Sequence, residues 1–354
     1  MNAQLAAVAA RNGGPFTAAE AYQAGFRPAD VRRLLAQGSW QRLGRSVYVD
    51  AALLRACASD PARRHAFDVA AALLRLRTHG RSAPVGSAAV GGTAVGSAAV
   101  GSRESAARLL RLSFLTEPSP EVRLTRDSGH ADGGKLRRAA LPAHHVTRAH
   151  AVPITSGART VVDLARELPF RDAVVLADSA LRRHVTSREE LAQVLRDCWT
   201  WRGIPAAGRV VDFADPRAES ALESLSRCGF HEKQLPPPDL QCWIAEDWQW
   251  LTRVDFLWWE QRTIAEGDGR FKYDGRVDVY AEKRLRERLE DLGFQIVPFG
   301  WRDVTEDLDG LAGRLRRAFA RGVAGALAPS VRISRTGPTP WASDPEDWWV
   351  ERRS

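Results

Sequence analysis

The stretch RVDFLWWEQRTIAEGDGRFKY, residues 253–273, contains two runs that are typical of β-strands, VDFLWW and TIAEGD. These runs carry three acidic residues, Asp255, Glu266 and Asp268. If the EQ pair between the runs forms the turn of a hairpin, the register places Asp255 opposite Glu266. Asp268 follows Glu266 by two residues and shares its face, because side chains alternate along a strand. The pattern therefore predicts three carboxylates on one face of a hairpin.

The rest of the hairpin predicts what holds these carboxylates together. Apolar side chains occupy both of its faces, so we expect the sheet to be covered on both sides. Like charges separated by about 5–7 Å repel one another strongly in such surroundings, and a divalent cation with oxygen ligands removes the conflict. We predict a Mg²⁺ or Mn²⁺ site with Asp255, Glu266 and Asp268 as ligands. The alternative is neutralisation by neighbouring cations: Arg253, Arg262 or Lys272.

The flanking segments predict a mixed α/β unit over residues 210–322. A helix is expected over 216–230, a basic helix around 281–292, and then the strand FQIVPF. Metal-bound carboxylates beside a basic helix suit phosphodiester hydrolysis, because the metal activates water and stabilises charge on the phosphate. Lys272 is a further catalytic candidate, and Glu219 or Glu223 could reach in from the helix, although both could equally be charges on the helix surface. The candidates for phosphate contacts are Arg284, Arg286 and Arg288.

Residues 1–50 predict a winged helix-turn-helix domain. Glycines are expected to end three short helices, and a T-x-x-E capping box opens the second helix. The following stretch, WQRLGRSVYVD, alternates like the hairpin that forms a wing. We predict that basic side chains of the third helix and the wing bind double-stranded DNA: Arg32, Arg33, Arg42 and Arg45. The alternative is a helical cap with solvated arginines.

The segment 51–200 is expected to form a mixed α/β middle domain. It contains GSAAVGGTAVGSAAVGS, and we predict a flexible insertion at 84–102, because small uncharged residues bury too little surface to become ordered. A glycine-rich phosphate cradle is the alternative, but no GK[ST] follows it. His144 and His145, with His150 nearby, could suggest a metal site, but neighbours on a strand point to opposite faces. Solvated loop histidines are therefore predicted. The Pro-rich segment 323–354 is predicted to be a disordered tail.

The composition of the 354-residue chain narrows its class. A net charge of +8 favours a polyanionic partner, nucleic acid first. The four cysteines are scattered without a CxxC pair, which argues against a zinc site or a disulfide framework. The N-terminus shows no signal-peptide pattern, and no run of about eighteen apolar residues exists. We therefore expect a soluble cytoplasmic protein without a membrane segment.

Two regions resemble known families. Residues 1–50, with their GG-x-hydrophobic-T start and the wing WQRLGRSVY, resemble the N-terminal domain of AbiEi-type antitoxins. The later motifs ESALES, RVDFLW, EGDGRFKY and LEDLGFQIV resemble very-short-patch-repair (Vsr-like) endonucleases of the PD-(D/E)XK superfamily. This second resemblance implies a restriction-endonuclease-like fold, with Asp255 as the metal-binding aspartate and Glu266 and Asp268 at the second acidic position. The superfamily pattern has lysine where this chain has Asp268, which leaves Lys272 as its possible substitute.

These observations lead to a multi-domain α/β protein and to two functions of different class. The first is a DNA-binding, Mg²⁺- or Mn²⁺-dependent endonuclease. The alternative is an AbiEi-type antitoxin or transcriptional repressor whose nuclease fold is inactive, encoded beside a toxin gene. A purely structural scaffold is a third and weaker option.

Overall fold

The computed structural model describes residues 1–79, 99–132, 134–267, 279–336 and 348–349. The chain divides into two compact units, Met1–Phe213 and Ala214–Ser354. Both units combine helices with mixed or antiparallel sheets, so the predicted α/β class is confirmed. None of the helices in the described ranges combines the length and the apolarity needed to cross a membrane.

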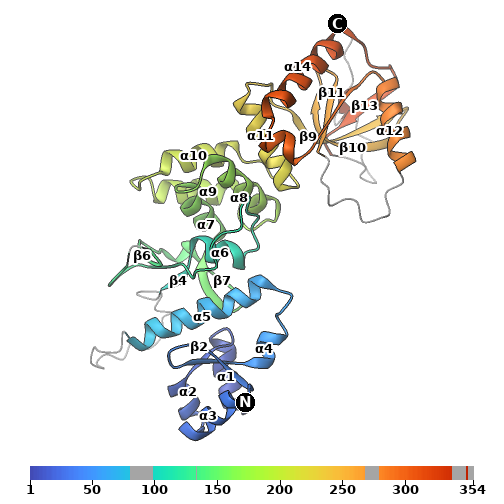
Figure 1. The fold of residues 1–354 in the computed structure, drawn as a ribbon. Helices are drawn as coiled ribbons and strands as arrows, with labels where there is room; N and C mark the ends of the chain where they lie inside the picture. Colours follow the sequence, from blue (N-terminus) through green and yellow to red (C-terminus); the bar gives the residue numbers. More distant parts are fainter. Residues whose placement is uncertain (80–98, 133, 268–278, 337–347, 350–354) are drawn as a thin grey trace. The chain divides into compact units, whose positions relative to one another are not determined.

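The first fifty residues form three helices and a three-stranded sheet of order β1-β3-β2 (Figure 1). The predicted capping box opens α2, where the Thr17 hydroxyl accepts from the backbone N–H of Glu20 and the Glu20 carboxylate accepts from that of Thr17. The third helix begins at Pro28, where a missing N–H costs nothing. Its apolar face packs into the core formed with α1 and the sheet. The bounds are α1 Ala3–Arg11, β1 Phe16–Thr17, α2 Ala18–Gln23, α3 Pro28–Ala36, β2 Trp40–Gly44 and β3 Val47–Asp50.

The long helix α5 joins this domain to the rest of the first unit. It follows α4 and contacts β2 and β3 of the winged domain as well as α6 and β8 of the middle part (Figure 1). Gly14 has φ +115° after α1, and an added Cβ there would lie 2.3 Å from the Phe67 ring of α5. The glycine therefore permits close packing of the two parts. The bounds are α4 Ala51–Arg55 and α5 Pro61–His79.

The middle part contains a five-stranded sheet of order β6-β5-β4-β8-β7 and a group of helices. Every residue of α7 is buried, as is most of α8, and the buried charges of α7, Arg159 and Asp163, pair with each other at 2.8 Å. The strands are β4 Val100–Gly101, β5 Leu124–Arg126, β6 Leu136–Arg138, β7 Val146–Ala149 and β8 Val152–Thr155. The helices are α6 Arg103–Leu109, η1 Ala143–His145, α7 Gly157–Ala165, α8 Phe170–Arg182, α9 Arg188–Asp197 and α10 Ile204–Phe213.

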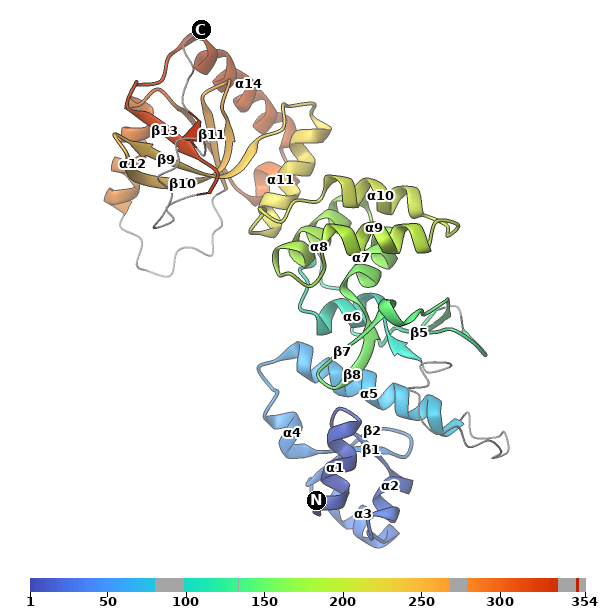
Figure 2. The same cartoon turned by 180° about the vertical axis from the view of Figure 1, so that it is seen from behind.

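The second unit is built on a six-stranded sheet of order β12-β11-β10-β9-β13-β14. Figure 2 shows α12 on one side of this sheet and α11 and α14 on the other. Aromatic contacts such as Trp258–Phe319, with centroids 5.1 Å apart, hold the α14 side. The helices are α11 Ala221–Glu232, α12 Val279–Asp291, α13 Trp301–Thr305 and α14 Leu308–Ala324. The strands are β9 Asp239–Glu246, β10 Gln249–Trp258, β11 Thr263–Gly267, β12 Gln295–Phe299, β13 Val331–Ser334 and β14 Trp348–Trp349.

Two predictions about irregular segments need correction. Val100 and Gly101, at the end of the predicted flexible insertion 84–102, form β4: both pair with β5, and Val100 is buried. The predicted disordered tail 323–354 contains β13, which pairs with β9 and buries Ile333. The sequence pattern did not predict this strand, because the run VRIS is only four residues long and lies in the Pro-rich segment. Residues 80–98, 337–347 and 350–354 of these segments lie outside the described residues.

Candidate functional site

The third helix of the winged domain presents basic side chains on its outer face. Val31 is buried in the core, whereas Arg32 and Arg33 are exposed. Arg33 forms an ion pair with Asp30 at 2.9 Å, within the same helix. Arg32 forms no ion pair with a described residue. In a helix-turn-helix domain this helix is the element that enters the major groove.

The wing adds two more basic side chains. Arg42 lies on β2 with its guanidinium 5.9 Å from the centre of the Tyr48 ring. Arg45 lies at the turn between β2 and β3, beside Ser46 with φ +58°. Both arginines are exposed. A helical cap with solvated arginines would expose these side chains equally. A helix and a wing that both carry arginines, however, are suited to contact DNA phosphates on either side of a groove.

The acidic hairpin of the second unit has the predicted register. Phe256 pairs with Ala265 and Trp258 with Thr263, so the same register places Asp255 opposite Glu266. The turn is closed by a backbone hydrogen bond of 3.0 Å from the N–H of residue 262 to the carbonyl of residue 259. Asp255 and Glu266 line one cavity of about 390 Å³. The other two predicted members of this site, Asp268 and Lys272, lie outside the described residues.

Among the described residues, the hydrogen bonds of Asp255 come from neutral groups. Its carboxylate accepts from the backbone N–H of Gly267 at 3.0 Å and from the Gln241 amide at 3.4 Å. Arg253 instead makes a bidentate ion pair with Glu219, at 2.9 and 2.7 Å. Asp255 has no ion pair with any residue that the structure describes. Arg253 is thus excluded as its partner.

Glu223 is buried rather than a surface charge. Its oxygens accept from the Ser220 hydroxyl at 2.8 Å, the backbone N–H of Glu219 at 2.9 Å and the Gln241 amide at 2.9 Å. Burial raises the pKa of Glu223, and the nearby charge of Asp255 raises it further. With these three donors Glu223 is better suited to positioning Gln241, and through it Asp255, than to binding a metal.

Gln241 is a functional candidate that the sequence did not reveal. Its backbone has φ +53° within β9, and its amide reaches both Glu223 and Asp255. The β9–β10 register runs through this position without a shift, so the left-handed backbone here is local and is held by the surrounding structure. Nothing in the local pattern LQCW signals this, since glutamine has no turn preference of its own.

The described carboxylates of the acidic hairpin suit a divalent cation. Asp255 and Glu266 offer carboxylate oxygens at one cavity, and Mg²⁺ usually takes one or two carboxylates together with phosphate and water. Of the three arginines predicted to contact phosphate, Arg286 lines this cavity. Arg288 is engaged by Glu246. Arg286 is thus the one of these three that lines the cavity, where its Nε also pairs with Glu290 of the same helix at 3.3 Å.

A third cluster contradicts the prediction for His145, whereas His144 is exposed as expected. His144 and His145 lie on the 3₁₀ helix η1, and their Nε2 atoms lie 2.6 and 3.0 Å from Asp197 Oδ2. His145 is buried, so it is not a solvated loop residue. The prediction assumed a strand, on which neighbours diverge; on a 3₁₀ helix they lie about 120° apart and can converge.

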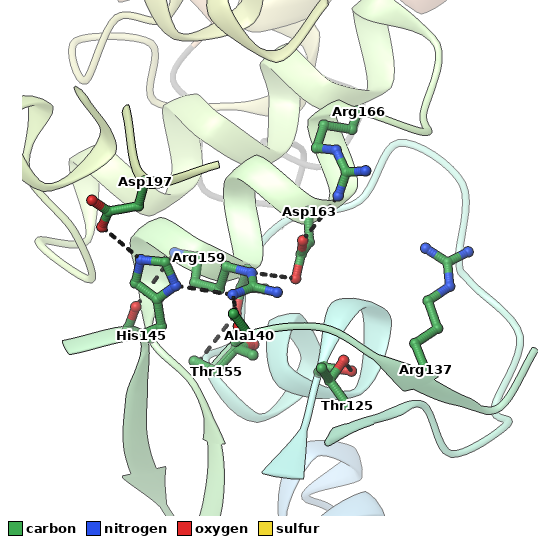
Figure 3. Close-up of polar contacts among 12 residues, drawn as sticks. Thr125, Arg137, Ala140, His145, Thr155, Arg159, Asp163, Arg166 and Asp197 are labelled. Carbon is green, nitrogen blue, oxygen red and sulfur yellow. Dashed lines mark hydrogen bonds and ion pairs between the residues drawn. The ribbon is translucent and has the colours of Figure 1, made fainter. Parts of the chain in front are cut away.

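The hydrogen bonds around His145 indicate a structural role rather than a metal site. Arg159 donates to His145 Nδ1 at 2.9 Å, so Nε2 must carry the proton and donate to Asp197 (Figure 3). A protonated Nε2 has no lone pair for a metal. Burial, followed by the charge of Arg159, lowers the pKa of His145 and keeps the ring neutral. The chain of contacts continues from Arg159 to Asp163 at 2.8 Å.

Comparison with known proteins identifies the N-terminal domain. Residues 3–49 match the model of the family described as "Transcriptional regulator, AbiEi antitoxin". The resemblance of this region to AbiEi antitoxins, predicted from the sequence, is therefore confirmed. The family match ends at residue 49, so the resemblance of the C-terminal region to Vsr-like endonucleases stays a prediction.

Two relatives are similar in sequence to about half of this chain. They are uncharacterized proteins from two strains of Mycobacterium tuberculosis, each 35% identical over 167 residues. The similar region covers 47% of this chain and 62% of each relative, which is less than two thirds of their length.

Proposed function

We propose that this protein is a DNA-binding transcriptional regulator of the AbiEi antitoxin type. The observation that carries the proposal is the exposed set of arginines on α3 and the wing, within the domain that matches the family model. Arg32 and Arg33 on the helix would contact the major groove, and Arg42 and Arg45 would contact flanking phosphates. Double-stranded DNA is therefore the partner, and the net charge of +8 supports it.

Footprinting of the full chain on the region upstream of its own gene tests this proposal. We expect protection of a defined site that is lost when Arg32→Ala and Arg33→Ala are combined. The matched control combines Arg182→Ala and Arg183→Ala, two exposed arginines elsewhere in the same unit. Equal protection by both double variants, or no preference over random DNA, would overturn the assignment.

The family description also supports a protein partner, namely a toxin whose effect the chain would neutralise. Co-expression of the chain with the product of the neighbouring gene tests this part. Rescue of growth by the wild-type chain is expected, and the absence of any toxic neighbour would remove this part of the proposal while leaving DNA binding intact.

A second candidate function is metal-dependent phosphodiester hydrolysis in the C-terminal unit. It is supported by Asp255 and Glu266, which line one cavity without an ion pair between Asp255 and a described cation. Asp255 and Glu266 would hold Mg²⁺ or Mn²⁺, Glu223 and Gln241 would orient Asp255, and Lys272 or Asp268 would complete the site. The bound metal would supply activation of water.

Plasmid nicking with Mg²⁺ or Mn²⁺ separates this candidate from an inactive nuclease fold. Asp255→Asn keeps the size of the side chain and should abolish nicking, whereas Glu219→Gln, which affects only the exposed pair with Arg253, should not. Equal nicking by wild type and Asp255→Asn would assign the activity to a contaminant. No nicking by wild type would leave the regulator as the function.

A further inference from the structure

A cavity of about 390 Å³ in the first unit, away from the winged helix, is lined mainly by arginines. We call it the arginine pocket. Figure 3 shows Arg137 on β6 and Arg166 on α7, with Asp163 and Thr125 nearby. The residues that line it are Arg103, Thr125, Arg137, Arg138, Ala139, Ala140, Asp163, Arg166, Trp201 and Arg202.

The charges of the arginine pocket do not balance. Asp163 is the one acidic residue of its lining, and it already pairs with Arg159 at 2.8 Å and with Arg166 at 3.4 Å. Arg137 pairs with Glu167 outside the lining. The remaining lining arginines form no ion pair with a described residue: Arg103, Arg138 and Arg202.

Arg103 carries an unsatisfied donor inside the protein. The residue is 4% exposed, and its terminal NH₂ group donates to the carbonyl of Gly134 at 2.7 Å. Its Nε atom is buried and has no hydrogen-bond partner in the described part of the chain. An orphaned donor on a buried cation is costly, so such a group usually has an acceptor in the functional state. Burial and the charge of Arg137 both lower the pKa of Arg103, in accordance with its crowded positive surroundings.

Arg103 is also held in a conformation that ordinary side chains avoid. Its φ is +50° at the first position of α6, directly after β4. A left-handed residue other than glycine costs of order 1 kcal/mol and persists only where the surrounding structure fixes it. The tight connection between β4 and α6 therefore fixes the position of the Arg103 backbone, from which its side chain extends.

We propose that the arginine pocket binds a small ligand that carries two or more phosphate groups. Guanidinium groups match phosphate through paired N–H donors, and several of them together suit a ligand with two or more negative charges. The volume of the cavity is at the small end of ligand sites and is sufficient for a mononucleotide. Arg103 is buried too deeply for the surface of a DNA duplex to reach it.

The positions of the arginines indicate how each would contribute to ligand binding. Arg138 and Arg202 are exposed at the rim, where they would meet the phosphates first. Arg166 donates from Nε to the carbonyl of Arg202 at 2.7 Å, which ties the two rim segments together. Trp201 lies beside them, with the guanidinium groups of Arg159 and Arg166 at 4.4 and 5.0 Å from its ring centre. These contacts hold the rim in place before a ligand arrives.

Isothermal titration of the full chain tests the proposal with four probes: ATP, pyrophosphate, adenosine and a short DNA duplex. We expect ATP and pyrophosphate to bind and adenosine not to bind, because the phosphates carry the recognition. The double variant Arg138→Ala with Arg202→Ala should weaken ATP binding by about a hundredfold, about tenfold for each charged hydrogen bond lost. Arg183→Ala, an exposed arginine outside the arginine pocket, is the control and should change nothing.

The possible outcomes are distinguishable. Arg138 and Arg202 are exposed, so their removal tests the site without threatening the fold; Arg103→Gln, checked by circular dichroism, tests its floor. The proposal would be overturned if adenosine bound as tightly as ATP. It would also be overturned if the double variant Arg138→Ala with Arg202→Ala kept its affinity for ATP. Binding of the duplex alone, with loss in the rim variant, would also overturn it, since the arginines would then contact a DNA backbone. None of these results depends on operator binding by the winged helix.

Discussion

At the scale of single residues, His145 shows how a buried network makes stability depend on pH. Burial and Arg159 lower its pKa below the ordinary value near 6.5, so the unfolded chain binds more protons than the folded chain below that pH. Stability from this residue is therefore complete above about pH 6.5 and is lost as the pH falls towards the folded pKa. His65 has a lowered pKa for the same main reason, burial, and adds to the trend.

His145→Gln should remove part of this dependence. Glutamine can accept from Arg159 and donate to Asp197 but does not titrate. From pH 7.5 to 5.0 we expect the wild type to lose more unfolding free energy than the variant, because only the wild type takes up a proton at this position on unfolding. Urea unfolding at several pH values measures it. His130→Gln, at an exposed position, should behave as wild type, and identical slopes for wild type and His145→Gln would show that His145 is not the source.

At the scale of elements, two helical glycines have opposite surroundings and give a matched pair of variants. Gly157 opens α7, and a Cβ there would lie 2.3 Å from the carbonyl oxygen of Val185. Gly208 lies inside α10 and has no other atom within 4 Å of the same position. The same substitution should thus have opposite signs at the two sites.

We expect Gly157→Ala to lower the unfolding free energy by about 1–3 kcal/mol, because the backbone of residue 185 must move. Gly208→Ala should raise it by about 0.5–1 kcal/mol, because alanine has the higher helix propensity. Thermal unfolding of both variants provides the measurement. A neutral Gly157→Ala would mean that α7 and the segment after α8 are not packed as closely as described.

At the scale of the whole molecule, the chain divides into two compact units, and the first of them contains both the predicted winged domain and the predicted middle domain. The winged domain shares α5 with the middle part, and α10, beyond the predicted boundary at residue 200, completes the first unit. Each unit has its own buried core, which is the physical requirement for independent folding.

We therefore expect each unit to fold and function as a separate fragment. A fragment of residues 1–213 is expected to keep the footprint of the full chain, and a fragment of residues 214–354 is expected to keep any Asp255-dependent nicking. Circular dichroism and the two assays check this. An unfolded 1–213 fragment, or one that needs the second unit for DNA binding, would show that the regulator works only as a whole.

The sequence by itself determined the features that depend on near neighbours. The capping box at Thr17, the start of α3 at Pro28 and the register of Asp255 with Glu266 follow from side chains a few residues apart, whose geometry is set locally. The same holds for the exposed arginines of α3, because helical periodicity decides which face is buried.

Only the tertiary structure decided which distant residues meet. The bridge from Glu223 through Gln241 to Asp255, the convergence of His145 on Asp197 and the arginine pocket each join separate segments. The arginine pocket draws its cations from β6, α6, α7 and the segment after α9, and no period in the sequence links these positions. Burial in the packed core, not local preference, brings these groups together and sets their pKa values.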